Sequence, residues 1–199
     1  MDIQKIKKYL DENKIKFEEL THKTVYTAHD IAQTLKAKLQ EIGKPLVVKA
    51  DGKYILVLLP ANRQLDIAKL KSKLGAKKIE IVSEKIMAET LKLKKEAVGA
   101  FGKLRQLKVY VDKNVLKNKK VIFATSDFTK SIKMAVKDFV KLEEAVVEEV
   151  SKTKEFKKVK AAAEKKVKKA KGQAKKVLNK LPVVIKKTKK QENKKTKKQ

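Results

Sequence analysis

The chain has 199 residues, of which 42% are hydrophobic and 38% charged, which is enough apolar material for one packed domain and an appendage. Its 53 basic residues against 23 acidic ones give a formal net charge of +30, so the expected partner is a polyanion, nucleic acid before acidic lipid. Cysteine is absent and there are two histidines. This excludes disulfides, thiolate sites and histidine-rich metal sites, and we expect no metal and no cofactor.

The first 50 residues predict two helices and the start of a sheet. Residues 3–10 carry isoleucine and leucine at helical spacing, and residues 14–20 look extended. Thr27 and Asp30 stand three apart, as in a capping box, and predict the start of a second helix. That helix is expected to bury Ile31, Leu35 and Leu39.

A hairpin and a third helix follow. Pro45 is expected to open a strand, and the dipeptide at 51–52, Asp-Gly, predicts a tight hairpin turn. The partner strand, residues 53–60, is almost continuously apolar, which is typical of a strand buried on both faces. Residues 65–74 predict a helix, for which Gly75 is a natural C-terminal cap.

The rest of the body predicts further strands and helices. A short helix is expected at 84–91, and an amphipathic helix at 138–150 that buries Phe139, Leu142 and Val146. Strands are expected at 77–83, 107–112, 121–125 and 131–136. Mixed strands and helices around one sheet predict a single α+β domain over residues 1–150.

The composition changes near Ser151. Residues 151–199 hold 21 lysines and three acidic residues. Apolar residues at threes and fours over 154–181 predict a marginal helix, and the segment after Pro182 is expected to be disordered. Lysine contacts phosphate as a point charge, so the tail is expected to bind RNA backbone without sequence preference; the alternative is a tail that only solubilises. The lysines expected to do so are Lys157, Lys158, Lys165, Lys166, Lys168, Lys169, Lys175 and Lys176.

The sequence shows no targeting or membrane-spanning pattern. The N-terminal run MDIQKIKKYL is charged and periodic, unlike a signal peptide. No apolar run approaches the roughly 20 residues that a membrane span requires. We therefore expect a cytoplasmic protein with no membrane partner.

Four motifs follow one another along residues 1–145: LTHKTVYTAHDIAQTL, KPLVVKADGKYILVLLPANRQLDIAKLKSKLGAKKIEIVS, AVGAFG and VYVD. In order and spacing they resemble the YbaK / prolyl-tRNA synthetase-associated editing-domain family of aminoacyl-tRNA deacylases. The resemblance implies a mixed, curled, barrel-like sheet around a pocket, flanked by helices. It also implies hydrolysis of the ester of mischarged tRNA, with aminoacyl-tRNA as partner and an aminoacyl-tRNA synthetase as a further candidate partner.

The resemblance also implies a set of site residues. Lys44 matches the family's functional lysine, at the opening of a strand, and is the candidate catalytic residue. The attacking group would be water, and loop glycines would let backbone amides approach the ester. The candidate substrate-binding residues are His22 and Tyr26 for the terminal adenosine, the loop residues Gly99, Ala100, Phe101 and Gly102, and Ser126 and Asp127, the latter for the amino group.

Each of these residues also has a purely structural interpretation. Lys44 could be a solvated lysine at a strand start, His22 a loop cap, and Asp127 an exposed turn residue. The chain departs from the family pattern at Ala100, where proline is usual, at Pro45, where a small hydroxyl residue is common, and at 125–128, where the family often carries a glycine-rich or histidine-bearing segment.

Three functional hypotheses follow. The first is a free-standing hydrolase that deacylates mischarged tRNA in trans, with the proline tRNA as the expected acceptor. The second is a catalytically inactive protein that binds tRNA or another nucleic acid through the same fold. The third is a DNA-compacting protein whose tail matters most, and it ranks last because it gives no reason for a complete pocket-forming domain.

Overall fold

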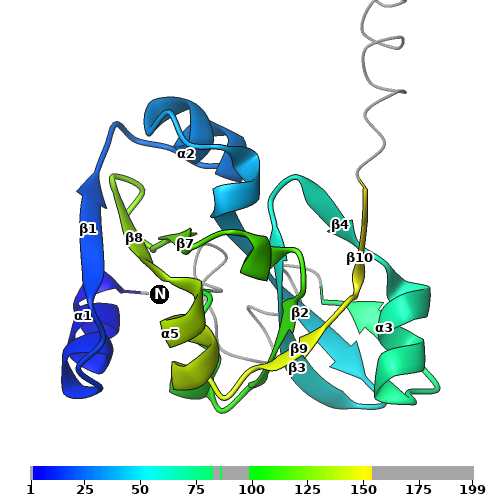
Figure 1. Ribbon diagram of the computed structural model, residues 1–199. Helices are drawn as coiled ribbons and strands as arrows, with labels where there is room; N and C mark the ends of the chain where they lie inside the picture. The colour runs from blue at the N-terminus through cyan, green and yellow to red at the C-terminus, as the bar shows by residue number, and fades with distance from the viewer. Residues whose placement is uncertain (1, 83–85, 87–98, 154–199) are drawn as a thin grey trace, which may run out of the picture. The chain divides into compact units, whose positions relative to one another are not determined.

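The computed structural model describes residues 2–82, 86 and 99–153 (Figure 1). The chain divides into two compact units, Met1–Lys154 and Glu155–Gln199, and all described residues belong to the first. The helix expected at 154–181, the segment after it and the eight tail lysines lie outside the described residues. So does the helix expected at 84–91, except for residue 86.

The first helix agrees with the sequence pattern. Helix α1, Ile3–Glu12, begins at Asp2, whose carboxylate accepts from the Gln4 amide, and buries the predicted isoleucines and leucine. Strand β1, Phe17–Thr21, follows. Phe17 of this strand packs against the core that α1 covers.

The second helix is shorter than predicted. Helix α2, Ala28–Thr34, has the expected capping box of Thr27 and Asp30 and buries Ile31. Leu35 is only its C-terminal cap, because Lys36 adopts a left-handed backbone with φ of 51°. Leu39 begins a separate 3-10 turn, η1, Leu39–Glu41, so the expected burial of Leu35 and Leu39 on one continuous helix is wrong.

The central hairpin confirms the prediction for strands on both sides of residues 51–52. Strand β2, Ile42–Ala50, begins before Pro45 and pairs antiparallel with β3, Lys53–Pro60. The turn residues Asp51 and Gly52 have φ of 44° and 87°, as a type I′ hairpin turn requires. The six residues 55–60 are all buried, which confirms a strand covered on both faces.

A small sheet and a capped helix stand beside this hairpin. The helix expected at 65–74 begins two residues later than predicted. Residue 65 is the last of strand β4, Arg63–Leu65, and helix α3 spans Ile67–Leu74 with Asp66 as its N-terminal cap. Gly75, with φ of 61°, ends α3 as predicted. Strand β5, Ile79–Ile81, follows.

The C-terminal half of the described chain contains one wrong prediction. The elements are η2 Lys103–Arg105, β6 Lys108–Asp112, η3 Val115–Lys117, β7 Lys120–Ala124, β8 Lys130–Ala135, α5 Val136–Leu142, β9 Val146–Glu148 and β10 Ser151–Thr153. The expected helix at 138–150 ends at Leu142 because Glu144 turns left-handed, with φ of 47°. Val146 and Val147 then extend parallel to β6, where β-branched residues pack well.

The strands form a mixed sheet of eight in the order β1-β8-β7-β2-β3-β6-β9, with β5 attached to β2. Its parallel pairs are β2·β7, β3·β6 and β6·β9, and β10 pairs with β4 in a second sheet. The α+β class is therefore confirmed. Within the described residues the end strands β1 and β9 do not pair, so the expected barrel-like closure is not found.

Two cores lie on the two faces of the β2–β3 hairpin. Val47 belongs to the core that α1 and α5 cover, where Phe101, Phe123 and Phe139 stack edge to face or tilted. Val48 belongs to the core that α3 covers through Leu70. Neighbouring β2 residues therefore face opposite sides, and this alternation decides which side chains reach the site.

Candidate functional site

The site begins at a break in the pairing of β2. Its outer edge pairs with β7 at residues 42–43 and with β5 at residues 48–50, which leaves residues 44–46 without a strand on that side. The Val47 carbonyl accepts from the Val82 amide at 2.9 Å. Carbonyls two residues apart along a strand point the same way, so the Pro45 carbonyl points to the open side.

A cleft of about 730 Å³ occupies this break. Its walls are β2, the start of α2, the ends of β5 and β7, and the turn at 127–131. Among the predicted site residues, five line it: His22, Tyr26, Lys44, Gly99 and Asp127. The other four, Ala100, Phe101, Gly102 and Ser126, do not.

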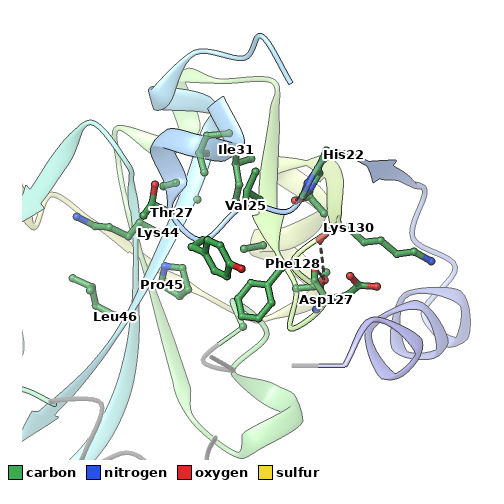
Figure 2. A pocket seen from close by; sticks show the side chains of 18 of the residues that line it. His22, Val25, Thr27, Ile31, Lys44, Pro45, Leu46, Asp127, Phe128 and Lys130 are labelled. Atoms are coloured by element: carbon green, nitrogen blue, oxygen red, sulfur yellow. Dashed lines mark hydrogen bonds between the residues drawn. The ribbon is translucent and has the colours of Figure 1, made fainter. Parts of the chain in front are cut away.

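Lys44 reaches the far side of this cleft. Its ammonium donates to the Arg63 carbonyl of β4 at 2.9 Å. Figure 2 shows the Lys44 side chain directed away from Phe128 and His22, whereas the Pro45 ring lies between them and the lysine. This orientation follows from the alternation along β2, because residue 44 shares the face of Val48 rather than that of Val47.

His22 joins β1 to β8. Its Nδ1 lies 2.9 Å from the Lys23 carbonyl and its Nε2 lies 2.8 Å from the Ser131 hydroxyl. A carbonyl only accepts, so Nδ1 carries the proton, and a neutral ring accepts from Ser131 at Nε2. The distances suit a serine–histidine pair, but Ser131 is 0% exposed, and a nucleophile must reach its ester. The pair therefore holds the strand ends together.

Two aromatic rings stand at the mouth of the cleft. Tyr26 is 75% exposed, and its ring centroid lies 5.0 Å from that of Phe128. The Val25 amide donates to the Phe128 carbonyl at 2.9 Å, which fixes the two segments side by side. An exposed tyrosine ring backed by a half-buried phenylalanine can stack on a nucleobase, whatever its identity.

The turn after β7 presents a carboxylate. Asp127 Oδ1 accepts from the Thr129 hydroxyl at 2.6 Å and from its amide at 2.9 Å. These bonds, the hydroxyl bond first, lower the pKa of Asp127 below its usual value, so the group is anionic. Thr125 braces the turn by donating to the Lys130 carbonyl at 2.9 Å. Oδ2 accepts no hydrogen bond from any described residue and suits an ammonium group.

The loop residues 100–102 support the site without lining it. Ala100 and Phe101 are buried in the α1/α5 core. A Cβ at Gly102 would lie 2.4 Å from Val109 Cγ2 and 2.8 Å from the Leu107 carbonyl, so glycine is required here for close packing. Gly99 alone reaches the cleft.

Most of the sequence that forms this cleft matches a known protein family. The family described as aminoacyl-tRNA editing domain matches residues 22–142. The chain belongs to the aminoacyl-tRNA editing domain family. The match includes the lining residues His22, Tyr26, Lys44, Gly99 and Asp127.

Relatives of this editing domain include parts of proline–tRNA ligases. The ligase of Staphylococcus saprophyticus is 37% identical over 89 residues, which is 44% of this chain and 15% of the ligase. That of Thermosipho melanesiensis is 31% identical over 98 residues, 49% of this chain and 17% of the ligase. The chain therefore matches less than a fifth of either ligase.

A solved structure shares the fold. It is described as a proposed trans-editing enzyme for prolyl tRNA synthetase, and it superposes with a TM-score of 0.64 at 22% identity over 75% of this chain and 96% of that one. Among the described residues, no cluster of three or more histidine or acidic side chains could hold a metal ion. No helix in that part of the chain is long and apolar enough to cross a membrane.

Several lining residues of the editing domain were missed by sequence reasoning. Phe128 and Thr125 lie in the segment where the sequence departs from the family pattern, and the Thr-Ser-Asp run before β8 is the turn signal that could have found them. Pro45 was treated as a strand start, although proline at an unpaired strand edge marks an open side.

Proposed function

We propose that this editing domain hydrolyses the ester of mischarged aminoacyl-tRNA, acting in trans, with the proline tRNA as acceptor. The observation that carries the proposal is the cleft at the break in β2, which brings the Tyr26–Phe128 ring pair, an anionic Asp127 and a basic Lys44 around one open strand edge. The likeness to parts of proline–tRNA ligases supports the acceptor. Prolyl-tRNA synthetase is the candidate protein partner, and the cytoplasm the site of action.

Each lining group has a role in this proposal. Tyr26 and Phe128 stack on the terminal base. Asp127 Oδ2 accepts from the substrate's α-ammonium group, and the Pro45 carbonyl is a second acceptor beside it. Lys44, on the β4 side, supplies the positive charge that offsets the charge developing on the ester in the transition state.

Water is the proposed nucleophile. An aminoacyl ester is already activated, so positioning and preorganised charge supply most of the required catalysis. The chain has no cysteine, and Ser131 is buried against His22. The substrate's own ribose hydroxyl is available to orient the water, and the Gly99 backbone lies at the cleft to approach the ester.

The test uses tRNA for proline charged with labelled alanine, serine or cysteine, beside the correctly charged tRNA. We expect selective release of label from one mischarged species. Lys44→Ala should lower kcat/KM by about 100-fold or more, while binding of uncharged tRNA stays within about twofold because other lysines dominate it. Intact binding with no hydrolysis of any species would leave the binding-protein hypothesis in its place.

Two control variants sharpen the result. Lys49→Ala removes a lysine from the same strand that lies over the Tyr54 ring and does not line the cleft, and it should hydrolyse at the normal rate. Ser131→Ala removes the hydroxyl bonded to His22. A water mechanism predicts a loss of no more than about tenfold, because only strand packing suffers, whereas a serine nucleophile predicts complete loss.

A further inference from the structure

The structure has a second cleft, of about 660 Å³. The first cleft is lined by the start of α2 and the end of β7, and the second by the residues after α2 and the start of β7. Figure 1 shows α2 above the strands β7 and β8. The two clefts therefore lie at opposite ends of the same two elements.

The walls of the second cleft are fixed. The Asn118 side-chain amide donates to the Gln40 carbonyl at 2.9 Å and to the Val115 carbonyl at 3.3 Å, which ties η1 to η3. Its floor is apolar and packs as one cluster of Leu20, Leu35, Ala37 and Ile122. A cleft whose walls are already tied together needs little ordering when a ligand binds.

Lysine dominates the rim. Five lysines line the cleft: Lys36, Lys117, Lys119, Lys120 and Lys133. Lys133 pairs with Glu18 at 3.0 Å. The other four are exposed and form no ion pair with any residue that the structure describes. The one acidic lining residue, Glu41, accepts from the Lys38 amide at 3.0 Å.

The lining chemistry selects the class of ligand. It includes no aromatic ring and no arginine, so neither base stacking nor forked base recognition is available. Four exposed ammonium groups against one lining carboxylate leave the cleft with a net positive charge, which attracts anions. A phosphodiester backbone presents such anions in series, with one phosphate per about 3.4 Å of each strand in a helix.

The length of α2 indicates how many nucleotides separate the two clefts along a bound strand. The seven residues of α2 span about 10 Å at 1.5 Å per residue. A strand of a few nucleotides covers that length. A strand whose terminal nucleotide occupies the first cleft therefore brings its preceding phosphates to the second.

We propose that this second cleft binds the phosphate backbone of the RNA strand whose 3′ end occupies the first cleft; the location of the 3′ end rests on the proposed function. The four exposed lysines neutralise phosphates near the end of the acceptor strand, and this grip is independent of sequence. The domain thus binds tRNA at two places: the first cleft binds the 3′-terminal nucleotide, and the second binds backbone phosphates.

The experiment is lysine footprinting on the full chain. The protein is acetylated with an amine-reactive reagent, with and without uncharged proline tRNA, and each lysine's rate is read by mass spectrometry. We expect Lys36, Lys117, Lys119 and Lys120 to react at least about threefold more slowly with tRNA, as phosphate contact shields them. Four exposed control lysines that line neither cleft, Lys5, Lys53, Lys71 and Lys77, should change little.

A matched pair of variants gives a second measurement. Changing the four cleft lysines to glutamine should make the slope of log affinity against log salt less negative by about three, at 0.7 to 0.9 per phosphate contact. Changing the four control lysines removes the same charge and should alter the slope by less than about one. Equal protection of both lysine sets, or equal slopes, overturns the proposal.

Two further outcomes separate the possible failures. Protection of the cleft lysines by anionic phospholipid vesicles but not by tRNA would also overturn it. Because uncharged tRNA carries no ester, the footprint does not depend on hydrolysis. A protein that protects these lysines but hydrolyses nothing would retain the second cleft as an RNA site and lose the proposed enzymatic function alone.

Discussion

The two clefts share α2 and β7 and differ in almost everything else. The first is lined by aromatic rings, a proline and a carboxylate whose neighbours brace it with short hydrogen bonds. The second is lined by lysines over an apolar floor. Directional groups favour a ligand of defined shape, whereas exposed ammonium groups favour charge of any arrangement. On this proposal, α2 and β7 separate a cleft that recognises the 3′ end of the RNA from a cleft that binds its phosphate backbone.

This contrast explains how a domain with many lysines can be selective. Binding through lysine weakens steeply as salt rises, whereas stacking and braced hydrogen bonds do not release counterions. Each change below therefore has a distinct expected pattern in salt dependence, stability and hydrolysis. The pattern shows whether the clefts act separately.

The largest effect is expected at Glu143, whose carboxylate holds the loop beside the first cleft. Its carboxylate is 3% exposed and accepts from the Tyr9 hydroxyl at 3.1 Å and the Lys103 amide at 2.9 Å. Glu143→Ala leaves these donors without an acceptor and should cost about 3 kcal/mol in unfolding free energy. It loosens the loop that leads to Gly99, so hydrolysis should fall while protection of the second-cleft lysines persists. Chemical denaturation and footprinting test this.

The same residue predicts a pH dependence. Burial raises the pKa of Glu143 in the folded state, against the opposing effect of its amide hydrogen bonds. The folded protein therefore holds this proton more tightly than the unfolded chain, and stability falls as pH rises from the unfolded pKa through the folded one. Glu143→Gln carries no charge and should flatten the fall. If Glu143→Gln loses as much unfolding free energy as the wild type when pH rises through this range, Glu143 is not the group responsible.

Gly43 is expected to affect both clefts at once. It pairs with Phe123 of the shared strand β7, and a Cβ added there would lie 2.7 Å from Phe123 Cε1 and 3.1 Å from Val121 Cγ2. Overpacking of this kind costs about 1 to 3 kcal/mol. Gly43→Ala should lower Tm and weaken both hydrolysis and lysine protection. Loss of only one of the two would mean that β7 is not a common wall.

Most of the fold could be predicted from local patterns, because capping and turn chemistry act over a few residues. The Thr27–Asp30 box, the Asp51–Gly52 turn and the Gly75 cap all form as expected. The helix expected at 138–150 was wrong because Glu144 turns left-handed and the following valines find a strand edge on β6. That edge is a tertiary partner, which no local pattern reveals.

The site could be predicted only in part, for a related reason. Resemblance pointed to Lys44, and the lysine does line the cleft. Its direction, toward the Arg63 carbonyl, depends on the strand alternation set by two separate cores. Phe101 was expected to bind substrate, yet it packs among three other aromatic rings. Residue type alone does not distinguish a ring in a core from a ring at a cleft mouth.

Tyr26→Ala should affect the first cleft alone. Loss of one stacked base contact costs about 1 to 3 kcal/mol, so KM for mischarged tRNA should rise about tenfold. The change in Tm should be small because the ring is 75% exposed. Tyr26→Phe keeps the ring and serves as the matched control. A ratio of wild-type to Tyr26→Ala affinity that shrinks as salt rises would show that the contact is electrostatic instead.

The smallest effect is expected at Ser151, and it tests whether Lys44 is positioned from outside the cleft. The Ser151 hydroxyl accepts from Arg63 Nε at 2.6 Å, and the Arg63 carbonyl accepts from Lys44. Ser151→Ala leaves the half-buried Nε–H of Arg63 without its acceptor, at a cost of about 1 kcal/mol. If that cost falls on the placement of Lys44, kcat drops about fivefold.

The comparison of kcat with KM makes this prediction specific. Ser151 lines neither cleft, so KM for mischarged tRNA and the salt slope of binding should stay unchanged. Lys152→Ala, at an exposed position of the same strand, is the matched control and should leave kcat unaltered. A Ser151→Ala protein with lowered stability and normal kcat would mean that Lys44 keeps its place through β2 alone. The pairing of β4 with β10 would then serve the fold and not the reaction.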